Sequence, residues 1–318
     1  MIRYIVGRLL LAIPLVLIVS VICFVLLRLT TDPISMYNVS ELTGDDFIRI
    51  RHQLGLDRPI YVQYAVWLGR ALQLDWGYSF ASHRPVRDII FERLPRTLIL
   101  AGAAQLLVVV AALGMAILAA LRPYSLFDNL LTTATFVVYS MPIFWLALGL
   151  MYIFAVYFKH WGLPYLPTGG DVWNYGDPLQ LLWHLVLPVV SLASVSAASQ
   201  GRYLRSAMLE IINEDYVRTA EAKGLSESKV LVRHVLKNAA IPLVTLIGLQ
   251  LPGLVSGAIV TETIFSWPGM GRAFWESINL GDYPVVMAIL LIVSLVVVAA
   301  QLLVDISYTI LDPRIRYD

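Results

Sequence analysis

Charged residues are scarce in this sequence. Only 14% of its 318 residues are charged, whereas a soluble domain carries about a quarter. Hydrophobic residues make up 58% of the chain, and its mean hydropathy is +0.74. This shortfall of charge excludes an ordinary soluble domain and places the chain among membrane proteins. The 23 basic and 22 acidic residues nearly cancel, so nothing in the charge favours binding of nucleic acid.

Residues that build disulfides, metal sites and nucleotide sites are also few. Cys23 is the lone cysteine and cannot form an intrachain disulfide. The five histidines lack the spacing of metal ligands. The phosphate-binding pattern Gly-x-x-x-x-Gly-Lys-Ser/Thr does not occur. We therefore expect neither a metal site nor ATP hydrolysis in this chain.

Long apolar runs dominate the sequence instead. Because about 20 apolar residues cross a bilayer as a helix, the sequence predicts six spans: Leu9–Leu27, Thr97–Leu121, Leu130–Phe158, Leu179–Gln200, Ala239–Thr261 and Tyr283–Val304. The first run is longer than the apolar part of a signal peptide, and no cleavage site follows it. We expect an all-α, polytopic membrane protein with a single transmembrane domain over residues 1–318.

Basic residues in short loops indicate the orientation of the spans. With the N-terminus inside, the inner segments hold about twelve Lys and Arg residues, whereas the short outer loops hold only Lys159 and Arg272. Both termini are therefore predicted to be cytoplasmic. Residues 29–96 then form a long extracytoplasmic segment between the first two spans.

Segment 29–96 has the pattern of a folded structure. Capping and breaking residues predict three short helices: one from Asp45 to Gly55, one from Pro59 to about Leu74, and one from Pro85 to just before Pro95. A later stretch, Trp267–Gly271, predicts a turn followed by a short helix to Leu280. We expect that helix at the outer mouth or packed against segment 29–96.

Residues 201–241 form the main polar segment on the inner side. Asp215 is the predicted N-cap and Gly224 the predicted C′ residue of a first helix. A second helix is expected from Glu227 to about Asn238, leading toward the fifth span. Helix, glycine turn and helix would form a compact knob at the membrane surface.

Small residues mark one face of the first predicted helix in this segment. Ala220 and Gly224 lie four residues apart, on the same face. Neither carries a bulky side chain, so we expect that face to let another protein approach the backbone closely. An ordinary amphipathic connector is the alternative that these features alone leave open.

A family resemblance favours the first of these two interpretations. The segment contains the run Tyr216-Val217-Arg218-Thr219-Ala220-Glu221-Ala222-Lys223-Gly224-Leu225-Ser226. It resembles the EAA loop of ABC importer permeases, in the form found in the dipeptide, oligopeptide and nickel permease family, first-permease type. Arg218-Thr219-Ala220 replaces the general Glu-Ala-Ala, a departure that this branch tolerates. The resemblance continues along the chain in Leu54-Gly55-Leu56-Asp57-Arg58-Pro59, in Glu262–Gly271 and in Leu311–Arg316.

This resemblance implies a type I ABC importer permease fold with six transmembrane helices in a prokaryotic cytoplasmic membrane. It implies a non-catalytic subunit that pairs with a second homologous permease and receives substrate from an extracytoplasmic solute-binding protein. Two ATPase subunits, which would hold ATP and magnesium, are expected to dock on the knob. The residues expected to contact an ATPase are Tyr216, Ala220, Glu221, Ala222, Gly224 and Leu225.

Di- and oligopeptides are the expected substrates, and half of the translocation pathway is expected in this chain. The same role in a nickel or metallophore importer is the alternative, because residues 75–81 resemble the nickel branch. Two rival classes are a stand-alone secondary transporter and an integral-membrane enzyme. The former often has an internal repeat, which we do not find, and the latter needs an intramembrane acid pair or a similar catalytic set, which is also absent.

Polar residues in the spans suggest where the pathway lies. The fourth span is rich in serine and alanine from Ser191 to Ser199, a composition typical of helices that pack closely or line a wet path. The candidates for the translocation pathway are Ser194, Ser199, Gln250 and Glu262. For Glu262, which lies near the end of its span, a structural role is the favoured interpretation and a place in the pathway the alternative. Arg202 and Arg205 are expected to anchor the fourth span at the inner surface.

Overall fold

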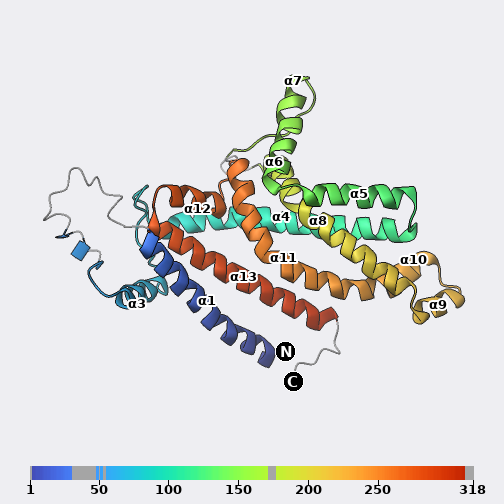
Figure 1. The fold of residues 1–318 in the computed structure, drawn as a ribbon, viewed down its shortest axis with the longest axis horizontal. Helices are drawn as coiled ribbons and strands as arrows, with labels where there is room; N and C mark the ends of the chain where they lie inside the picture. The colour runs from blue at the N-terminus through green and yellow to red at the C-terminus, as the bar shows by residue number, and fades with distance from the viewer. Residues whose placement is uncertain (1, 31–47, 50, 53–54, 171–176, 312–318) are drawn as a thin grey trace. The chain divides into compact units, whose positions relative to one another are not determined.

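The computed structural model describes residues 2–30, 48–49, 51–52, 55–170 and 177–311 (Figure 1). Across these residues the regular structure is helical, apart from one isolated bridge between Tyr78 and Pro85. The all-α prediction is therefore confirmed. The described chain forms two compact units. We call Leu98–Trp267 with the residues from Ala300 onward the central unit, and Ile2–Thr97 with Pro268–Ala299 the flanking unit.

The helices begin and end as follows: α1 Ile2–Thr30, α3 Ile60–Ala71, α4 Val86–Leu121, α5 Leu126–Ser140, α6 Ile143–Met151, η3 Tyr152–Tyr157, α7 Phe158–His160, α8 Pro178–Ile212, α9 Asp215–Ala222, α10 Glu227–Val230, η5 Leu231–Leu236, α11 Lys237–Ile264, α12 Met270–Asn279 and α13 Tyr283–Leu311. The elements η3 and η5 are π-helices. Within the described residues, five stretches are long and apolar enough to cross a membrane: Val6–Thr30, Val86–Leu121, Ile143–His160, Pro178–Ile212 and Tyr283–Ser307. The predicted fifth span lies within α11, a helix of 28 residues that is not one of these five.

The predicted third span, Leu130–Phe158, is wrong as a single continuous helix. Helix α5 ends at Ser140 and α6 begins at Ile143, with Met141 between them in an extended conformation at φ −82° and ψ 132°. A proline ring disfavours the helical conformation in the residue before it, and Pro142 follows Met141. An apolar run measures length and composition only, so it did not reveal this break.

The third short helix predicted in segment 29–96 is also wrong in its end. Helix α4 begins at Val86, directly after Pro85, but it continues through Pro95 to Leu121. A proline removes one backbone donor from a helix, and membrane helices tolerate this where neighbouring groups satisfy the freed carbonyl. Helical sequence extends on both sides of Pro95, and α4 therefore continues through this proline.

The other outer elements follow the prediction more closely. Helix α3 begins after Pro59 and ends at Ala71, three residues before the predicted Leu74. Gly55 has a φ of +66°, as expected of a residue that ends a helix. The predicted start of that first helix at Asp45 lies outside the described residues, and so does the tail motif from residue 312 onward.

In the central unit, α8 packs against α5, α6 and α11 (Figure 1). The core between α4, α8 and α11 contains many small side chains, among them Ala104, Ala193 and Ala258. Gly201 lies so close to α4 that an added Cβ would be 2.8 Å from Met115 Cε. Small residues allow membrane helices to approach closely, which explains the Ser- and Ala-rich sequence on this side of α8.

In the flanking unit, a buried carboxylate joins distant parts of the sequence. Asp282 is 2% exposed and accepts hydrogen bonds from the Ser79 hydroxyl and from the Phe80 N–H at 3.0 Å. The core of this unit places Met270 and Ala273 of α12 together with residues of segment 29–96. The helix predicted after Trp267–Gly271 is thus present as α12, and it packs against segment 29–96.

Candidate functional site

Helix α9 and helix α10 form a knob, residues 215–230, whose turn is fixed by a glycine. Gly224 has a φ of +79°. Its N–H donates to the Glu221 carbonyl at 2.8 Å, and the Leu225 N–H donates to the Ala220 carbonyl at 3.4 Å. This pair of bonds is a Schellman motif with glycine at C′, as predicted. Asp215 is the first helical residue rather than the predicted N-cap, because Glu214 holds the cap position without a side-chain bond.

The predicted open face of Ala220 and Gly224 is wrong for Ala220. That side chain is 5% exposed and belongs to a core cluster with Val217 of α9 and Leu204 and Met208 of α8. Val217 and Ala220 lie three residues apart and form the buried apolar face of α9. An amphipathic helix turns this face toward the core, because burial removes its apolar side chains from water. The small side chain of Ala220 therefore lets α9 approach the rest of its own chain.

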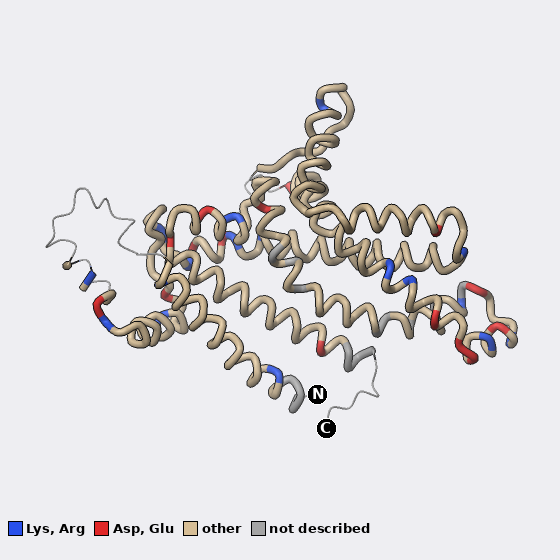
Figure 2. Tube along the Cα trace, in the orientation of Figure 1, with Lys and Arg blue, Asp and Glu red and all other residues tan. Residues whose placement is uncertain are grey.

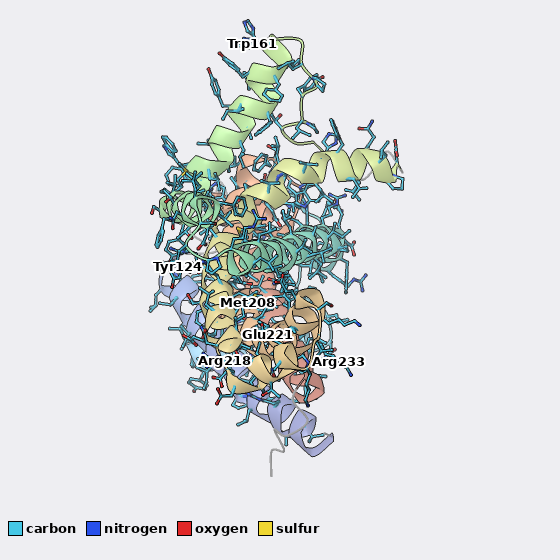
Figure 3. The ribbon with its side chains drawn as sticks, turned by 90° about the vertical axis from the view of Figure 1, so that its right-hand side faces the viewer. Tyr124, Trp161, Met208, Arg218, Glu221 and Arg233 are labelled. Atoms are coloured by element: carbon cyan, nitrogen blue, oxygen red, sulfur yellow. The ribbon has the colours of Figure 1, made fainter. Side chains whose placement is uncertain are left out.

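The exposed surface of the knob consists of other residues. Of the residues expected to contact an ATPase, the structure exposes Tyr216, Glu221, Ala222, Gly224 and Leu225. Figure 3 shows Arg218, Glu221 and Arg233 together at the α9–α10 end of the central unit, with Trp161 at the far end of the same unit. Acidic and basic residues gather on α9 and α10, whereas α5 and α11 carry few charges (Figure 2).

The knob is joined to the long helix α11 without a loop. The second helix begins at Glu227 as predicted, but it does not end near Asn238, because α10, η5 and α11 follow one another directly. Asn238 Nδ2 also donates to the Tyr216 hydroxyl at 3.1 Å, which ties α9 to the start of α11. The knob and α11 are therefore linked both by continuous helical backbone and by a side-chain hydrogen bond.

A pocket of about 610 Å³ lies in the central unit between the α5–α6 break, α8 and α11. Its lining is Tyr139, Met141, Ile143, Leu192, Val195, Ser196, Ser199, Leu249, Gln250, Gly253, Gly257 and Val260. None of these residues carries a formal charge. The break at Met141 exposes residues of α5 and α6 to the pocket, so the same proline that divides the third span also shapes this space.

The structure brings together two of the four pathway candidates. Ser199 and Gln250 line the pocket, and Gln250 Oε1 accepts a hydrogen bond from Gln200 Nε2 at 3.0 Å. Ser194 is not part of the lining, and its hydroxyl donates to the Val190 carbonyl of its own helix. Glu262 is fully buried and also lies outside the lining.

Sequence reasoning missed the α5 and α6 side of this pocket. Tyr139, Met141 and Ile143 flank Pro142 in the sequence, and that proline was the available signal. Ser196 was also missed, although it lies three residues before Ser199 and therefore on the same face of α8.

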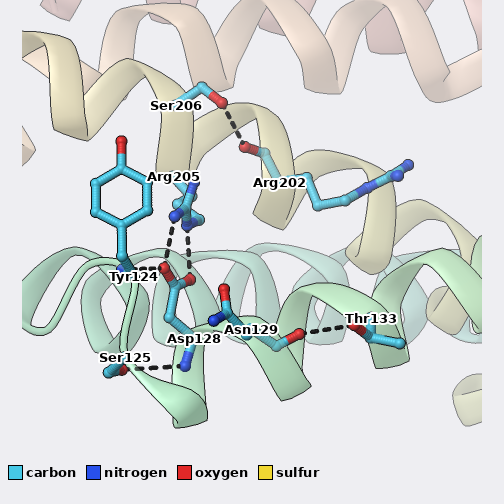
Figure 4. Close-up of polar contacts among 8 residues, drawn as sticks. All are labelled: Tyr124, Ser125, Asp128, Asn129, Thr133, Arg202, Arg205 and Ser206. Carbon is cyan, nitrogen blue, oxygen red and sulfur yellow. Dashed lines mark hydrogen bonds and ion pairs between the residues drawn. The ribbon is translucent and has the colours of Figure 1, made fainter.

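A buried ion pair lies where α8 meets the start of α5 (Figure 4). Arg205 Nε donates to Asp128 Oδ1 at 2.7 Å, and its Nη2 donates to Oδ2. The Tyr124 N–H donates to the same carboxylate at 2.8 Å, and Asp128 is fully buried. Asp128 lies before the predicted third span, and the bonds from Arg205 hold the pKa of its carboxyl below the usual value. Arg205 thus has a specific partner within the chain, which the sequence alone did not reveal, while its predicted anchoring at the inner surface stays a prediction.

Two family models match the chain. Residues 1–101 match the N-terminal membrane component of binding-protein-dependent transport systems, and residues 112–317 match the inner membrane component of the same systems. The chain belongs to this family. The permease matches full-length relatives as well. It is 38% identical to the oligopeptide transport system permease protein AppB of Bacillus subtilis, over 100% of both chains.

This permease is also 38% identical to the glutathione transport system permease protein GsiC of Escherichia coli K12, again over 100% of both chains. Among solved structures, the crystal structure of an amino acid ABC transporter with histidines matches with a TM-score of 0.48 and 16% identity, and covers 70% of this chain and 93% of that chain. The family match, together with the apolar helices, makes the chain a multi-pass membrane subunit of a transport complex with other subunits.

Proposed function

We propose that this chain is the permease subunit of an ATP-driven importer of di- or oligopeptides. The observation that carries the proposal is the match along the whole chain to a permease named for oligopeptide transport. The pocket supports it, because its neutral lining of apolar, hydroxyl and amide groups suits uncharged peptide bonds and varied side chains. The chain would supply half of the pathway, and a second homologous permease the other half.

The complex would contain two ATPase subunits, which bind ATP and magnesium, and an extracytoplasmic solute-binding protein. The chain itself would be non-catalytic and lie in the cytoplasmic membrane with both termini inside. Exposed residues of the knob, among them Tyr216, Glu221 and Leu225, would contact one ATPase. Ala220 would contribute by holding α9 against its own chain rather than by direct contact.

The continuous helix from the knob to the pocket supports a simple coupling mechanism. Closure of the ATPase pair around ATP would displace the knob, and η5 and α11 would carry that displacement to Gln250 and Gly253 in the pocket lining. A secondary element couples two sites when both sites bias its choice between two arrangements, and Pro242 inside α11, between η5 and Gln250, is a position where this helix could change its bend. ATP hydrolysis would then restore the starting arrangement.

Reconstitution tests this function directly. The complex isolated through a tag on this chain is placed in liposomes with its binding protein, and uptake of labelled tripeptides is measured with and without ATP. We expect the two ATPases to co-purify and peptide uptake to require ATP. Uptake that persists without ATP, or that is driven by an ion gradient, would contradict the importer role. ATP-dependent uptake of nickel without peptide uptake would contradict the substrate class only.

A further inference from the structure

Arg202 lies beside the pocket through its contact with Tyr139, although it is not itself a lining residue and borders a smaller pocket next to Arg205. The α8 residues that line the pocket recur at helical spacing: Leu192, Val195, Ser196 and Ser199. Arg202 lies three residues beyond Ser199 and continues the same helix face. Its guanidinium carbon lies 4.2 Å from the ring centroid of Phe136 and 4.7 Å from that of Tyr139. Because Tyr139 itself lines the pocket, both α8 and α5 place Arg202 next to this space.

Arg202 differs from Arg205 in how its charge is balanced. Arg205 shares both of its bonds with Asp128, so that carboxylate is occupied. Figure 4 shows the guanidinium of Arg202 directed away from the Arg205–Asp128 pair. Its Nε donates to the Ala198 carbonyl at 3.3 Å, and among the described residues no carboxylate lies within ion-pair distance of it. Within the part of the chain that the structure describes, the Arg202 guanidinium thus lies beside a neutral pocket with no carboxylate paired to it.

The stacked geometry of Arg202 suits recognition of a carboxylate. A guanidinium that lies on aromatic faces keeps its planar edge available, and that edge matches the two oxygens of a carboxylate. The rings also restrict the motion of the side chain, so less entropy is lost when an anion binds. Every linear peptide with a free C-terminus carries such a carboxylate.

We infer that Arg202, held by Phe136 and Tyr139, forms a site beside the pocket for the carboxylate of a peptide in transit. This inference rests on the proposed function. The neutral lining would accommodate peptide backbones and side chains of many kinds, while the single positive charge would attract the one group that all these substrates share.

A pair of peptides tests the inference in the reconstituted complex. The two peptides have the same sequence and end in a carboxylate or in an amide, and both are first shown to load the isolated binding protein. Uptake rates are compared at equal, saturating concentrations of loaded binding protein. We expect the wild-type complex to transport the acid about tenfold faster than the amide, the size of a charge-assisted hydrogen bond. In Arg202→Gln the ratio of the two rates should fall close to one.

Matched variants separate recognition from structure. Arg202→Lys keeps the charge and should retain part of the preference for the acid. Arg205→Gln breaks the ion pair with Asp128 and should change the uptake of both peptides by the same factor. If Arg202→Gln does not assemble, Arg202→Met, which keeps an apolar stem on the two rings, replaces it and should likewise abolish the preference.

The outcomes distinguish the two proposals. An Arg202 variant that lowers both uptake rates equally, as it would if the arginine held a lipid phosphate or only stabilised the fold, would overturn the carboxylate site alone. An unchanged ratio would do the same. A wild-type complex that takes up neither peptide with ATP would overturn the proposed function and the carboxylate site with it.

Discussion

Single residues in the central unit divide into those that hold the fold and those that face a ligand or a partner. Gly224 fixes the turn of the knob because only its backbone adopts a φ of +79° without strain. Ala220, four residues earlier, has the opposite role and is buried in its own chain. Arg205 and Arg202 form a similar contrast, since one is bound to Asp128 and the other lies beside the pocket.

Replacement of Gly224 tests the turn. Space around it is open, with no atom within 4 Å of an added Cβ, so the effect of a substitution comes from the backbone. Gly224→Val should cost about 1–2 kcal/mol because a β-branched residue is strained at positive φ, and we expect loss of ATPase co-purification with insertion preserved. Gly224→Asn is the control, since asparagine adopts this conformation readily. If the wild type and the valine variant bound the ATPase equally well, the knob would not be part of the docking surface.

Replacement of Asp128 tests the ion pair. Asp128→Asn leaves Arg205, whose side chain is 20% exposed, without its carboxylate. Because only one partner is buried, the loss should cost about 1.5–3 kcal/mol, the range of a hydrogen bond to a charged group. The expected result is a lower thermal unfolding temperature of the purified protein. Because the pKa of Asp128 is lowered from 3.8, the pair contributes its full stability above that pH and loses it as the pH falls through the lower, folded-state pKa.

An exposed residue near Asp128 provides a control for the unfolding measurement. Arg122 is exposed in the same connection between α4 and α5, so Arg122→Gln should change stability by less than about 0.5 kcal/mol. The double variant Asp128→Asn, Arg205→Gln should lose less than the sum of the two single variants, because one interaction is removed in both. Strict additivity would show that the two side chains act independently.

At the scale of elements, two prolines in helical sequence have opposite consequences. Pro142 separates α5 from α6, whereas α4 passes through Pro95 without a break. The break at Met141 places residues of both α5 and α6 in the pocket lining. The π-helix η5 has the opposite effect to the break at Met141, because it joins the knob to α11 without a loop.

Pro142→Ala tests whether the break shapes the pocket. Without the proline ring Met141 is free to become helical, and we expect α5 and α6 to merge and the pocket to narrow. A cysteine at Ser199, in a protein where Cys23 is serine, should then react more slowly with a thiol reagent. Pro95→Ala is the matched control and should leave that reactivity unchanged, because the helix is already continuous there. An unaltered rate in Pro142→Ala would contradict the role given to the break.

At the scale of the whole molecule, the distribution of charge predicts how the chain lies in the membrane. Basic residues gather on the knob and near the chain ends, and few lie in the short loops expected outside. By the positive-inside rule, the side with more Lys and Arg is cytoplasmic, so the knob and both chain ends are predicted to face the cytoplasm. The charge count, rather than the packing of the helices, carries this prediction.

Cysteine labelling in intact cells tests the orientation. In a variant that carries serine at Cys23, a cysteine at Lys159 should react with an impermeant maleimide from outside. A cysteine at Lys223 should react only after the membrane is opened. The reverse pattern would show that the knob faces outward, which would contradict ATPase docking at that surface.

The amino-acid sequence by itself determined the membrane class, the helical fold, most helix starts and the turn at Gly224. These features depend on composition, on apolar run length and on the local conformations of proline and glycine, all of which act within a few residues. The family resemblance, carried by residues 216–226 and motifs along the chain, led to the same family that the comparisons show.

Only the tertiary structure decided which faces are buried and which residues meet. It placed Ala220 in the core, paired Arg205 with Asp128 across 77 positions of sequence, and brought the α5–α6 break to Ser199 and Gln250. Burial and pairing are properties of contacts between distant segments, and periodicity describes one helix at a time. For this reason the sequence predicted the knob and most of the spans, while the division of the third span, the pocket and the environment of Arg202 emerged only from the tertiary structure.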